Sequence, residues 1–348
     1  MANGGELAEP AALLDLLAEG AVRTASPTGG FRRLELRSVR FGGAETLILG
    51  DSIIPSGGET PGEPIPRALC ARRRDELMLA RRSRDEGKAE AAIDFVRRRL
   101  GASAAWSSGD KADIFILDAE SPEDAPHEGY SIKAFDMGLP TLLNASGATT
   151  IRYRNLLDPC SAPAAPLRPQ GKGISIRDAL ATLHRCAMPE RPWDVSYERE
   201  TFRNNLLLSG ADFDEAFAAA LRIAMKTGKT RVSALAIDVA LELEFPRRFM
   251  EEAFRTFLTG CLRGMLPAVP WDGKGDADGG LLLAAAHGEG AGTALIRAKD
   301  GDVLADFLYE AARFERGSGN RYPPDPAFPP NDPAFSLTAQ IRLALPKR

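Results

Sequence analysis

Two short stretches of the chain contain an acid, a serine and a lysine whose types and spacing suit the hydrolysis of a phosphodiester. Asp113 stands at the start of the apolar run 114–117, and Ser131 and Lys133 alternate with apolar residues in 129–134. A carboxylate can bind Mg²⁺ while water and phosphate oxygens complete the shell, and a lysine can position the attacking water. These residue types therefore indicate metal-assisted hydrolysis. They are also common at strand ends of α/β proteins, so a purely structural interpretation stays open.

Two neighbouring strands must position these side chains. Residues 114–117 are all apolar, which is typical of a strand buried on both faces. Because successive strand residues point to opposite faces, Ser131 and Lys133 are expected on one face of the next strand. A loop of turn-forming residues joins the two stretches at near-hairpin spacing. We therefore expect the acid and the lysine at the same edge of one sheet.

The rest of the chain mixes helical and extended patterns, which indicates an α/β fold. Helices are expected over residues 5–20, 65–100, 178–186, 212–227, 232–243 and 247–262, and strands over 31–39, 45–49, 281–286, 293–297 and 335–345. A proline-rich span, 158–169, marks a boundary or a long surface loop.

Length and composition exclude several classes of protein. With 348 residues and 44% hydrophobic residues, the chain can bury a sizeable core in one domain or two. We find no uncharged apolar stretch of membrane-spanning length and no signal peptide, so we expect a soluble cytoplasmic protein. The four cysteines show no CxxC pairing, which argues against a zinc site or a disulfide framework. The net charge of −4 argues against nonspecific coating of nucleic acid.

Two local features have competing interpretations. The basic stretch 67–99 is either a solvated helix with i,i+4 ion pairs or a surface that contacts phosphates. The glycine-rich stretch 271–280 lacks the order of a phosphate loop or a dinucleotide fingerprint, so we expect it to be structural. It could alternatively form the lip of a small-molecule site.

Several motifs, in order, resemble those of the HpaII-like type II restriction endonucleases, a branch of the PD-(D/E)XK nuclease superfamily. KADIFI at 111–116, GYSIKA at 129–134 and TLLNASGATT at 141–150 resemble the family's K-x-DI strand, GFSIKS strand and TLLNAS-x-x-TN loop. Further similar blocks are GELAE at 5–9, GMLP at 264–267 with WDG and GG after it, GSGNRY at 317–322 and LTAQIRL at 337–343. Departures from the family pattern are Leu7, Ala134, Thr150 and Tyr322. They suggest a different DNA target.

The resemblance implies roles for individual residues. Asp113 would bind the metal and Lys133 would be the catalytic lysine, while Ser131 stands where the superfamily usually places a second acid. We favour Glu9 as the replacement acid and Glu6 after it; the other candidates are Glu90, Asp94, Asp118 and Glu128. Asp118 is a poor co-ligand, since it is at the far end of the strand and on its opposite face. The residues expected to contact DNA are Asn144, Ser146, Thr149, Asn320 and Arg321, each with a turn or surface role as the alternative. Arg342 is expected to form a structural ion pair.

The resemblance also implies a fold, a cofactor and partners. We expect a restriction-endonuclease-like mixed β-sheet flanked by helices, with residues 1–157 forming an N-terminal arm and catalytic core. Residues 158–348 would form a helical and C-terminal part that clamps DNA. The implied cofactor is Mg²⁺, and the implied partners are double-stranded DNA, a second copy of the chain on DNA and a cognate DNA methyltransferase. The family namesake reads CCGG. The alternatives are a DNA-binding protein with an inactive nuclease fold and a small-molecule-binding α/β protein.

Overall fold

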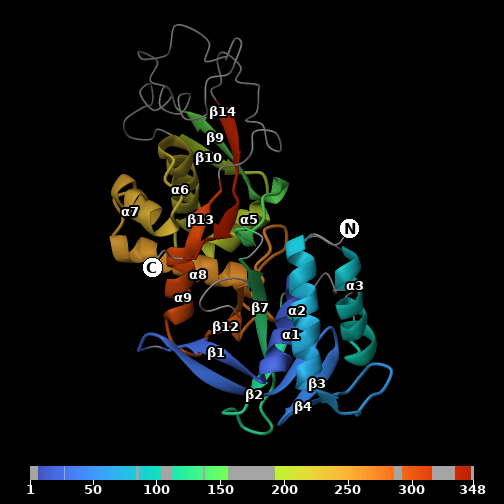
Figure 1. The fold of residues 1–348 in the computed structure, drawn as a ribbon. Coiled ribbons are helices and arrows are strands. Elements are labelled where there is room, and N and C mark those ends of the chain that lie inside the picture. Colours follow the sequence, from blue (N-terminus) through green and yellow to red (C-terminus); the bar gives the residue numbers. More distant parts are fainter. Residues whose placement is uncertain are drawn as a thin grey trace, which may run out of the picture. The chain divides into compact units, whose positions relative to one another are not determined.

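The computed structural model describes residues 7–26, 28–83, 86–102, 112–135, 138–155, 193–285, 292–315 and 334–345. They form a mixed α/β protein with two compact units (Figure 1). Unit 1 comprises residues 1–140, 262–264 and 274–306, and unit 2 comprises 141–261, 265–273 and 307–348. The expected division at residue 157 into a catalytic and a DNA-recognition part is a functional one and stays a prediction.

A nine-stranded mixed sheet forms the centre of unit 1, in the order β1-β12-β11-β7-β6-β2-β3-β4-β5. Only the β1–β12 and β11–β7 pairs are parallel among the described strands. The strand β1 also pairs with β2, so β1, β12, β11, β7, β6 and β2 close a ring. The strands are β1 (Ala21–Ala25), β2 (Phe31–Phe41), β3 (Ala44–Leu49), β4 (Ser52–Pro55), β5 (Ile65–Pro66), β6 (Ile114–Asp118), β7 (Glu128–Ala134), β11 (Gly280–Ala285) and β12 (Gly292–Arg297).

A helical layer packs on one face of this sheet. It contains α1 (Ala8–Glu19), α2 (Arg67–Ser83), α3 (Glu86–Asp94) and the π-helical turn η1 (Phe95–Arg99), with α1 packed against α2, β7 and β12 (Figure 1). The helical pattern expected over 65–100 is confirmed for most of that range, but it is divided into separate helices and residues 65–66 form β5. The leucines of α1 share a core with Ile114, Ile132 and Leu295.

The helix α1 forms where the sequence predicts it. Leu13, Leu16 and Leu17 recur at helical spacing and are buried. The helix ends at Gly20, which has φ 56° and donates its N–H to Leu16 O at 2.8 Å. A side chain at Gly20 would be strained at this φ, and its Cβ would also lie 2.7 Å from Arg67 Cζ.

Unit 2 combines helices with two three-stranded sheets. The helices are α5 (Glu200–Leu207), α6 (Phe213–Thr227), α7 (Val232–Glu242) and most of α8 (Arg247–Arg263), and the unit boundary falls within α9 (Val303–Ala311). One sheet has the order β10-β9-β14, with β9 (Thr150–Asn155), β10 (Trp193–Tyr197) and β14 (Ala334–Thr338). The other has the order β13-β15-β8, with β8 (Thr141–Leu143), β13 (Ala312–Phe314) and β15 (Ile341–Leu343). Buried phenylalanines from several of these elements pack edge to face.

The expected helices 212–227, 232–243 and 247–262 are confirmed, and the expected helix 178–186 lies outside the described residues. The single closing strand expected over 335–345 is wrong, because β14 and β15 belong to different sheets. Between them, Ala339 donates its N–H to Thr149 O at 3.0 Å and accepts from Thr149 Oγ1 at 2.9 Å. These two bonds hold the chain where it passes from one sheet to the other. Within the described residues, no helix has the length and apolarity to cross a membrane.

Candidate functional site

Asp113 lies at the point where β6 begins, and its carboxylate is held against the neighbouring strand β7. The N–H of Asp113 donates to Tyr130 O at 2.9 Å. Its Oδ2 atom accepts the N–H of Ile132 at 2.5 Å and the hydroxyl of Ser131 at 3.2 Å. Two donors from one strand thereby fix the orientation of this carboxylate.

Ser131 and Lys133 lie on β7, in the interior of the sheet of unit 1. The strand runs between β6 and β11, and Ile114 pairs with Tyr130. Tyr130 and Ile132 belong to the core beneath the helical layer, so Ser131 and Lys133 point to the opposite face. Ser131 is only 4% exposed, and Lys133 is half-buried.

Lys133 lies beyond the start of β6, so β6 does not pair with it. Since β6 starts at Ile114, opposite Tyr130, the later residues of β7 extend beyond it. The backbone of Lys133 pairs with Leu283 of β11 on the other side. The structure thus brings Asp113 and Ser131 into direct contact and places Lys133 two residues further along the same strand face.

The oxygen donors at Asp113 suit a hard divalent cation better than a soft metal. Mg²⁺ binds through one or two carboxylates and keeps several waters or substrate oxygens, so it needs no cage of protein ligands. No group of three or more His, Cys, Asp or Glu residues that could hold a metal occurs in the described part of the chain. Among the described residues, Asp113 therefore offers the oxygen ligands that suit Mg²⁺, without the His and Cys ligands typical of a zinc site.

Glu9 lies in the first turn of α1 and is half-buried. The helix packs on β7 and β12 from the side that carries the leucine core. Asp113 contacts β7 at Ser131 and Ile132, so both acids belong to elements that touch this strand. Whether Glu9 completes one ligand set with Asp113 stays a prediction. Glu6 and Lys111 lie outside the described residues.

The other candidate acids have structural partners. Asp118 accepts the N–H and hydroxyl of Ser121 at 2.8 and 2.9 Å, and it pairs with Lys299 at 3.3 Å. Burial raises the pKa of Asp118, but the Ser121 hydrogen bonds and the Lys299 charge outweigh burial and leave the pKa below its usual value. Glu128 accepts from Tyr130 Oη and Lys299, each at 2.7 Å. These contacts hold both acids at the end of the β6–β7 pair that lies away from Asp113.

The remaining two acids lie in the helical layer. Glu90 is exposed on α3. Asp94 pairs with Arg97 and Arg98 at 3.7 and 3.8 Å.

The residues expected to contact DNA follow β8 in unit 2. Asn144 is exposed, whereas Thr149 is fully buried and Ser146 is half-buried. The Ser146 N–H donates to Thr149 Oγ1 at 3.1 Å, which closes a capping box around the short turn η2 (Gly147–Thr149). Ser146 and Thr149 therefore shape the loop and leave Asn144 as its exposed polar side chain. Asn320 and Arg321 lie outside the described residues, and the role of all five in DNA binding stays a prediction.

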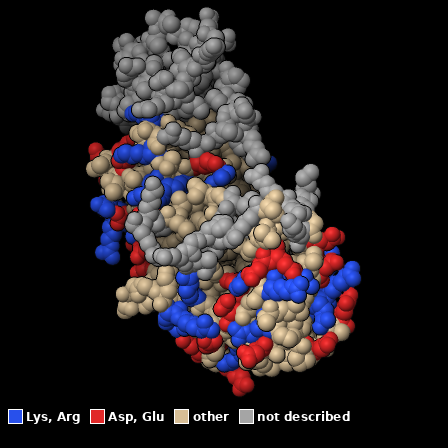
Figure 2. Space-filling view, in the orientation of Figure 1, with Lys and Arg blue, Asp and Glu red and all other residues tan. Residues whose placement is uncertain are grey.

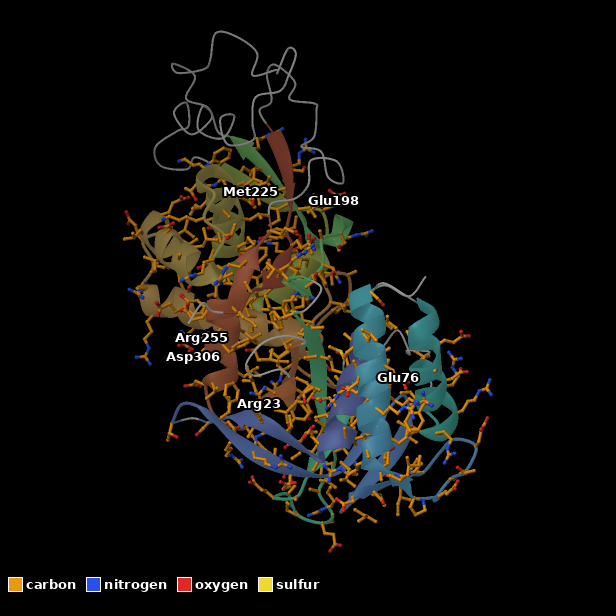
Figure 3. The ribbon with its side chains drawn as sticks, in the orientation of Figure 1. Arg23, Glu76, Glu198, Met225, Arg255 and Asp306 are labelled. Atoms are coloured by element: carbon orange, nitrogen blue, oxygen red, sulfur yellow. The ribbon has the colours of Figure 1, made fainter. Side chains whose placement is uncertain are left out.

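Most of the described arginine side chains in the basic stretch on α2 and η1 form ion pairs. Glu76 on α2, labelled in Figure 3, accepts from Arg72 at 3.0 Å and from Arg73 at 2.6 Å. Arg99 pairs with Glu63 at 3.4 Å. Basic and acidic side chains alternate over this part of the surface (Figure 2). The ion pairs that the solvated-helix interpretation expects are therefore present, while a contact of this stretch with phosphates is not tested.

The glycine-rich stretch before β11 has a structural role at the start of β7. Gly279 donates its N–H to Gly129 O at 2.8 Å, and Gly129 donates to Asp278 Oδ1 at 3.2 Å. A Cβ on Gly129 would lie 1.9 Å from the backbone oxygen of Asp276, so only glycine permits this close approach.

One group at the site was not foreseen from the sequence. The backbone N–H of Ile132 lies 2.5 Å from Asp113 Oδ2, closer than the Ser131 hydroxyl at 3.2 Å. Every residue except proline carries this donor, so no side-chain pattern could have identified it.

Comparisons with known proteins agree on one kind of enzyme. A family model described as HpaII restriction endonuclease matches residues 63–323, which is most of the chain. The type II restriction enzyme HpaII of Haemophilus parainfluenzae is 25% identical over 266 residues, covering 72% of this chain and 70% of that enzyme. No solved structure matches. The matched region contains Asp113, Ser131 and Lys133, whereas Glu9 precedes it.

Proposed function

Because this chain belongs to the HpaII restriction endonuclease family, we propose that it makes Mg²⁺-dependent double-strand breaks at a short specific sequence in duplex DNA. The observation that carries the proposal is the arrangement at the start of β6. There the Asp113 carboxylate is fixed by the Ser131 hydroxyl and the Ile132 N–H, and Lys133 follows on the same face of β7.

In this proposal Asp113 is the acid that holds the cation. A bound Mg²⁺ would neutralise the negative charge that develops on the scissile phosphate. The two hydrogen bonds to Oδ2 keep the carboxylate from rotating, so the acid is oriented before any ligand arrives. Glu9, or Glu6 in the same N-terminal arm, supplies the second carboxylate.

Lys133 acts on the water that attacks phosphorus. Its ammonium is a mobile positive charge on a flexible stem, so it can orient the water and donate a hydrogen bond to the phosphate. Because the lysine extends past the start of β6, its side chain can reach a phosphate held at Asp113. Ser131 contributes by orienting Asp113.

In this proposal, unit 2 recognises the DNA sequence. The exposed Asn144 is a candidate for reading a base edge, and Asn320 and Arg321 are further candidates. A target related to CCGG, action as a homodimer and a partner methyltransferase are part of the same proposal, and they follow from the family alone.

A DNA-binding protein with an inactive nuclease site is the second candidate. The observation that favours it is Ser131, an uncharged residue at the position where the superfamily usually has an acid. Such a protein would bind duplex DNA and leave it intact.

Incubation of supercoiled plasmid with the wild-type protein and with two variants distinguishes these candidates. Wild type with Mg²⁺ should give discrete linear fragments, and EDTA should stop the reaction. Asp113→Asn, which keeps an oxygen acceptor for Ile132, should bind DNA but give no detectable cleavage. Lys133→Ala should cleave about 10²-fold to 10⁴-fold more slowly.

The matched control is Asp124→Asn, which changes an exposed acid in the loop between β6 and β7. It should cleave as wild type does. DNA that is bound but never cut, by wild type as by Asp113→Asn, would establish the inactive-site alternative instead.

A further inference from the structure

The sheet β13-β15-β8 of unit 2 carries arginines in adjacent positions. Arg313 of β13 lies directly opposite Arg342 of β15, and Arg342 lies opposite Thr141 of β8. Arg231, just before α7, forms a further antiparallel bridge with Arg313. Directly opposite residues of antiparallel strands place their side chains on the same face, with Cβ atoms about 5 Å apart. Arg231, Arg313 and Arg342 thus form a row across the strands, which we call the arginine row.

This row lies on the face of the sheet that is turned away from the core. The residues that alternate with the arginines are all buried: Ala312, Phe314, Ile341, Leu343 and Leu143. Arg231 is exposed, and Arg313 and Arg342 are half-buried. The guanidinium groups are therefore on the polar side of a sheet whose other side is fixed by packing.

The positive charge of the row is only partly neutralised. Arg342 pairs through Nε with Glu315 at 2.9 Å, as its sequence context predicts. Arg313 donates to the backbone oxygens of Glu310 and Ala312 at 2.5 and 2.7 Å. No carboxylate of the described residues forms an ion pair with Arg231 or Arg313.

Like charges that face each other across strands destabilise a sheet. Burial, and after it the positive charge of Arg231, lowers the pKa of Arg313. The Glu310 carboxylate opposes this lowering of the pKa only in part. A bound anion beside Arg231 and Arg313 would relieve the repulsion between them.

The row is connected directly to the loop expected to contact DNA. The strand β8, which pairs with β15 at Arg342, leads straight into Asn144. At the far end of that loop, Thr149 is bonded through its backbone and its hydroxyl to Ala339, just before β15. The loop 144–149 is therefore anchored at one end to β15, which carries Arg342, and at the other end to Ala339, two residues before that strand.

We propose that the arginine row is a phosphate-contacting surface for duplex DNA, on which Arg231 and Arg313 bind backbone phosphates beside the loop 144–149. The inference rests on the proposed nuclease function and names a DNA contact of unit 2. The planar guanidinium group matches phosphate oxygens in a bidentate fork. Contacts of this kind fix the position of a protein on DNA without reading its sequence.

The test measures the binding of labelled duplex DNA in EDTA, which prevents cleavage, over a series of salt concentrations. Arg231→Gln and Arg313→Gln should each weaken binding about tenfold to a hundredfold, the loss expected for one charge-assisted contact. Each should also reduce the slope of log affinity against log salt by about 0.9, equally for unrelated sequences. Arg231→Lys should keep the wild-type slope. The control Arg247→Gln, which changes a 66% exposed arginine paired with Glu251 on α8, should bind as wild type does.

Two outcomes would overturn the inference, and they are distinguishable. If wild type cuts plasmid but both glutamine variants keep its affinity and salt slope, the row is not a DNA contact and the nuclease function stands. If wild type binds no duplex DNA and leaves plasmid intact, both the row and the proposed function fail. The side chain of Arg313 bonds to backbone oxygens of β13 and α9, so Arg313→Gln could unfold the protein. The Arg231 side chain forms neither of these bonds, so Arg231→Gln still tests the inference in that case.

Discussion

Asp113 has a structural role, and we propose a chemical role for it. Its carboxylate joins the start of β6 to β7 by accepting from Ser131 and Ile132. A hydrogen bond to a charged group contributes about 1.5–3 kcal/mol, so an alanine at this position would weaken the sheet as well as the site. Asparagine keeps an oxygen acceptor and removes the charge, so it separates the two roles.

Glu9 provides a second test at the scale of the residue. We predict that Glu9→Gln raises the Mg²⁺ concentration for half-maximal cleavage by about 10-fold to 100-fold, since a neutral amide is a weaker ligand than a carboxylate. The maximal rate at saturating Mg²⁺ should fall less. Cleavage rates over a Mg²⁺ titration measure both quantities.

The matched control is Glu19→Gln, at the other end of the same helix, where the side chain is 54% exposed. It should leave the Mg²⁺ dependence unchanged. Equal Mg²⁺ dependence of Glu9→Gln and wild type would exclude Glu9 as the second ligand. Glu6 would then be the next candidate.

Residue types and spacing predicted that Asp113 lies beside the strand of Ser131 and Lys133, because a short connection joins the two strands; the contact between Asp113 and Ser131 itself was not predicted. The same reasoning did not identify the Ile132 N–H, since a backbone donor leaves no signature in the sequence. A turn role was one alternative for Thr149, but its full burial in that turn could not be foreseen. That arrangement depends on Ala339, which is distant in sequence.

At the scale of the element, side-chain hydrogen bonds to β12 and α2 fix the position of α1. Asp15, only 8% exposed, accepts from the N–H and hydroxyl of Thr293 on β12, each at 2.9 Å, and from Arg74 on α2 at 2.8 Å. Arg67 donates to Ala18 O at 3.0 Å and to Gly50 O at 2.8 Å, which caps the end of the helix. These contacts set the position of the helix that carries Glu9.

We predict that Asp15→Ala lowers the free energy of unfolding by about 3 kcal/mol. The substitution leaves the N–H of Thr293 without its carboxylate acceptor and removes one of the three acids that pair with Arg74. Urea denaturation of wild type and variant measures the difference. Glu19→Ala, which removes an exposed acid that also pairs with Arg74, should cost less than about 1 kcal/mol; equal losses would refute the role assigned to Asp15.

A histidine links β2 and β3 to the loop before β7. His127 Nε2 lies 2.7 Å from Ser38 Oγ on β2 and 3.2 Å from Glu45 Oε1 on β3. Burial lowers the pKa of His127 below its ordinary value of 6.5, and Arg40 lowers it further, while Glu45 opposes the shift incompletely. The unfolded chain therefore binds a proton more readily than the folded protein.

The sign of the pH dependence follows from this shift. The contribution of a neutral His127 to stability is present above pH 6.5 and decreases as the pH falls from 6.5 toward the lowered pKa. We predict that wild type loses more stability than His127→Gln over that interval. Urea denaturation at a series of pH values measures both, and parallel curves would show that His127 does not contribute.

The periodicity of apolar residues predicted α1, α6 and α7, because a single helix face leaves a local signature. It did not predict that β14 and β15 are separate strands or that β1 closes a ring with β2 and β12. Both features arise from pairing between segments far apart in the chain, which local patterns do not encode.

At the scale of the whole molecule, the strand that carries Ser131 and Lys133 depends on a distant part of the chain. Its neighbours are β6, close in sequence, and β11, which lies in residues 280–285 and pairs in parallel. Close contact between Gly129 and Gly279 brings these segments together. The nine-stranded sheet of unit 1 therefore requires residues from both halves of the chain.

The central claim is that this protein is a site-specific nuclease whose reaction depends on Asp113. The measurement that tests it most directly is digestion of a sequenced plasmid with Mg²⁺, followed by sequencing of the fragment ends. We predict that all ends produced by the wild type share one short sequence and that Asp113→Asn produces none. Ends scattered over unrelated sequences, or plasmid that stays intact with wild type, would contradict the claim.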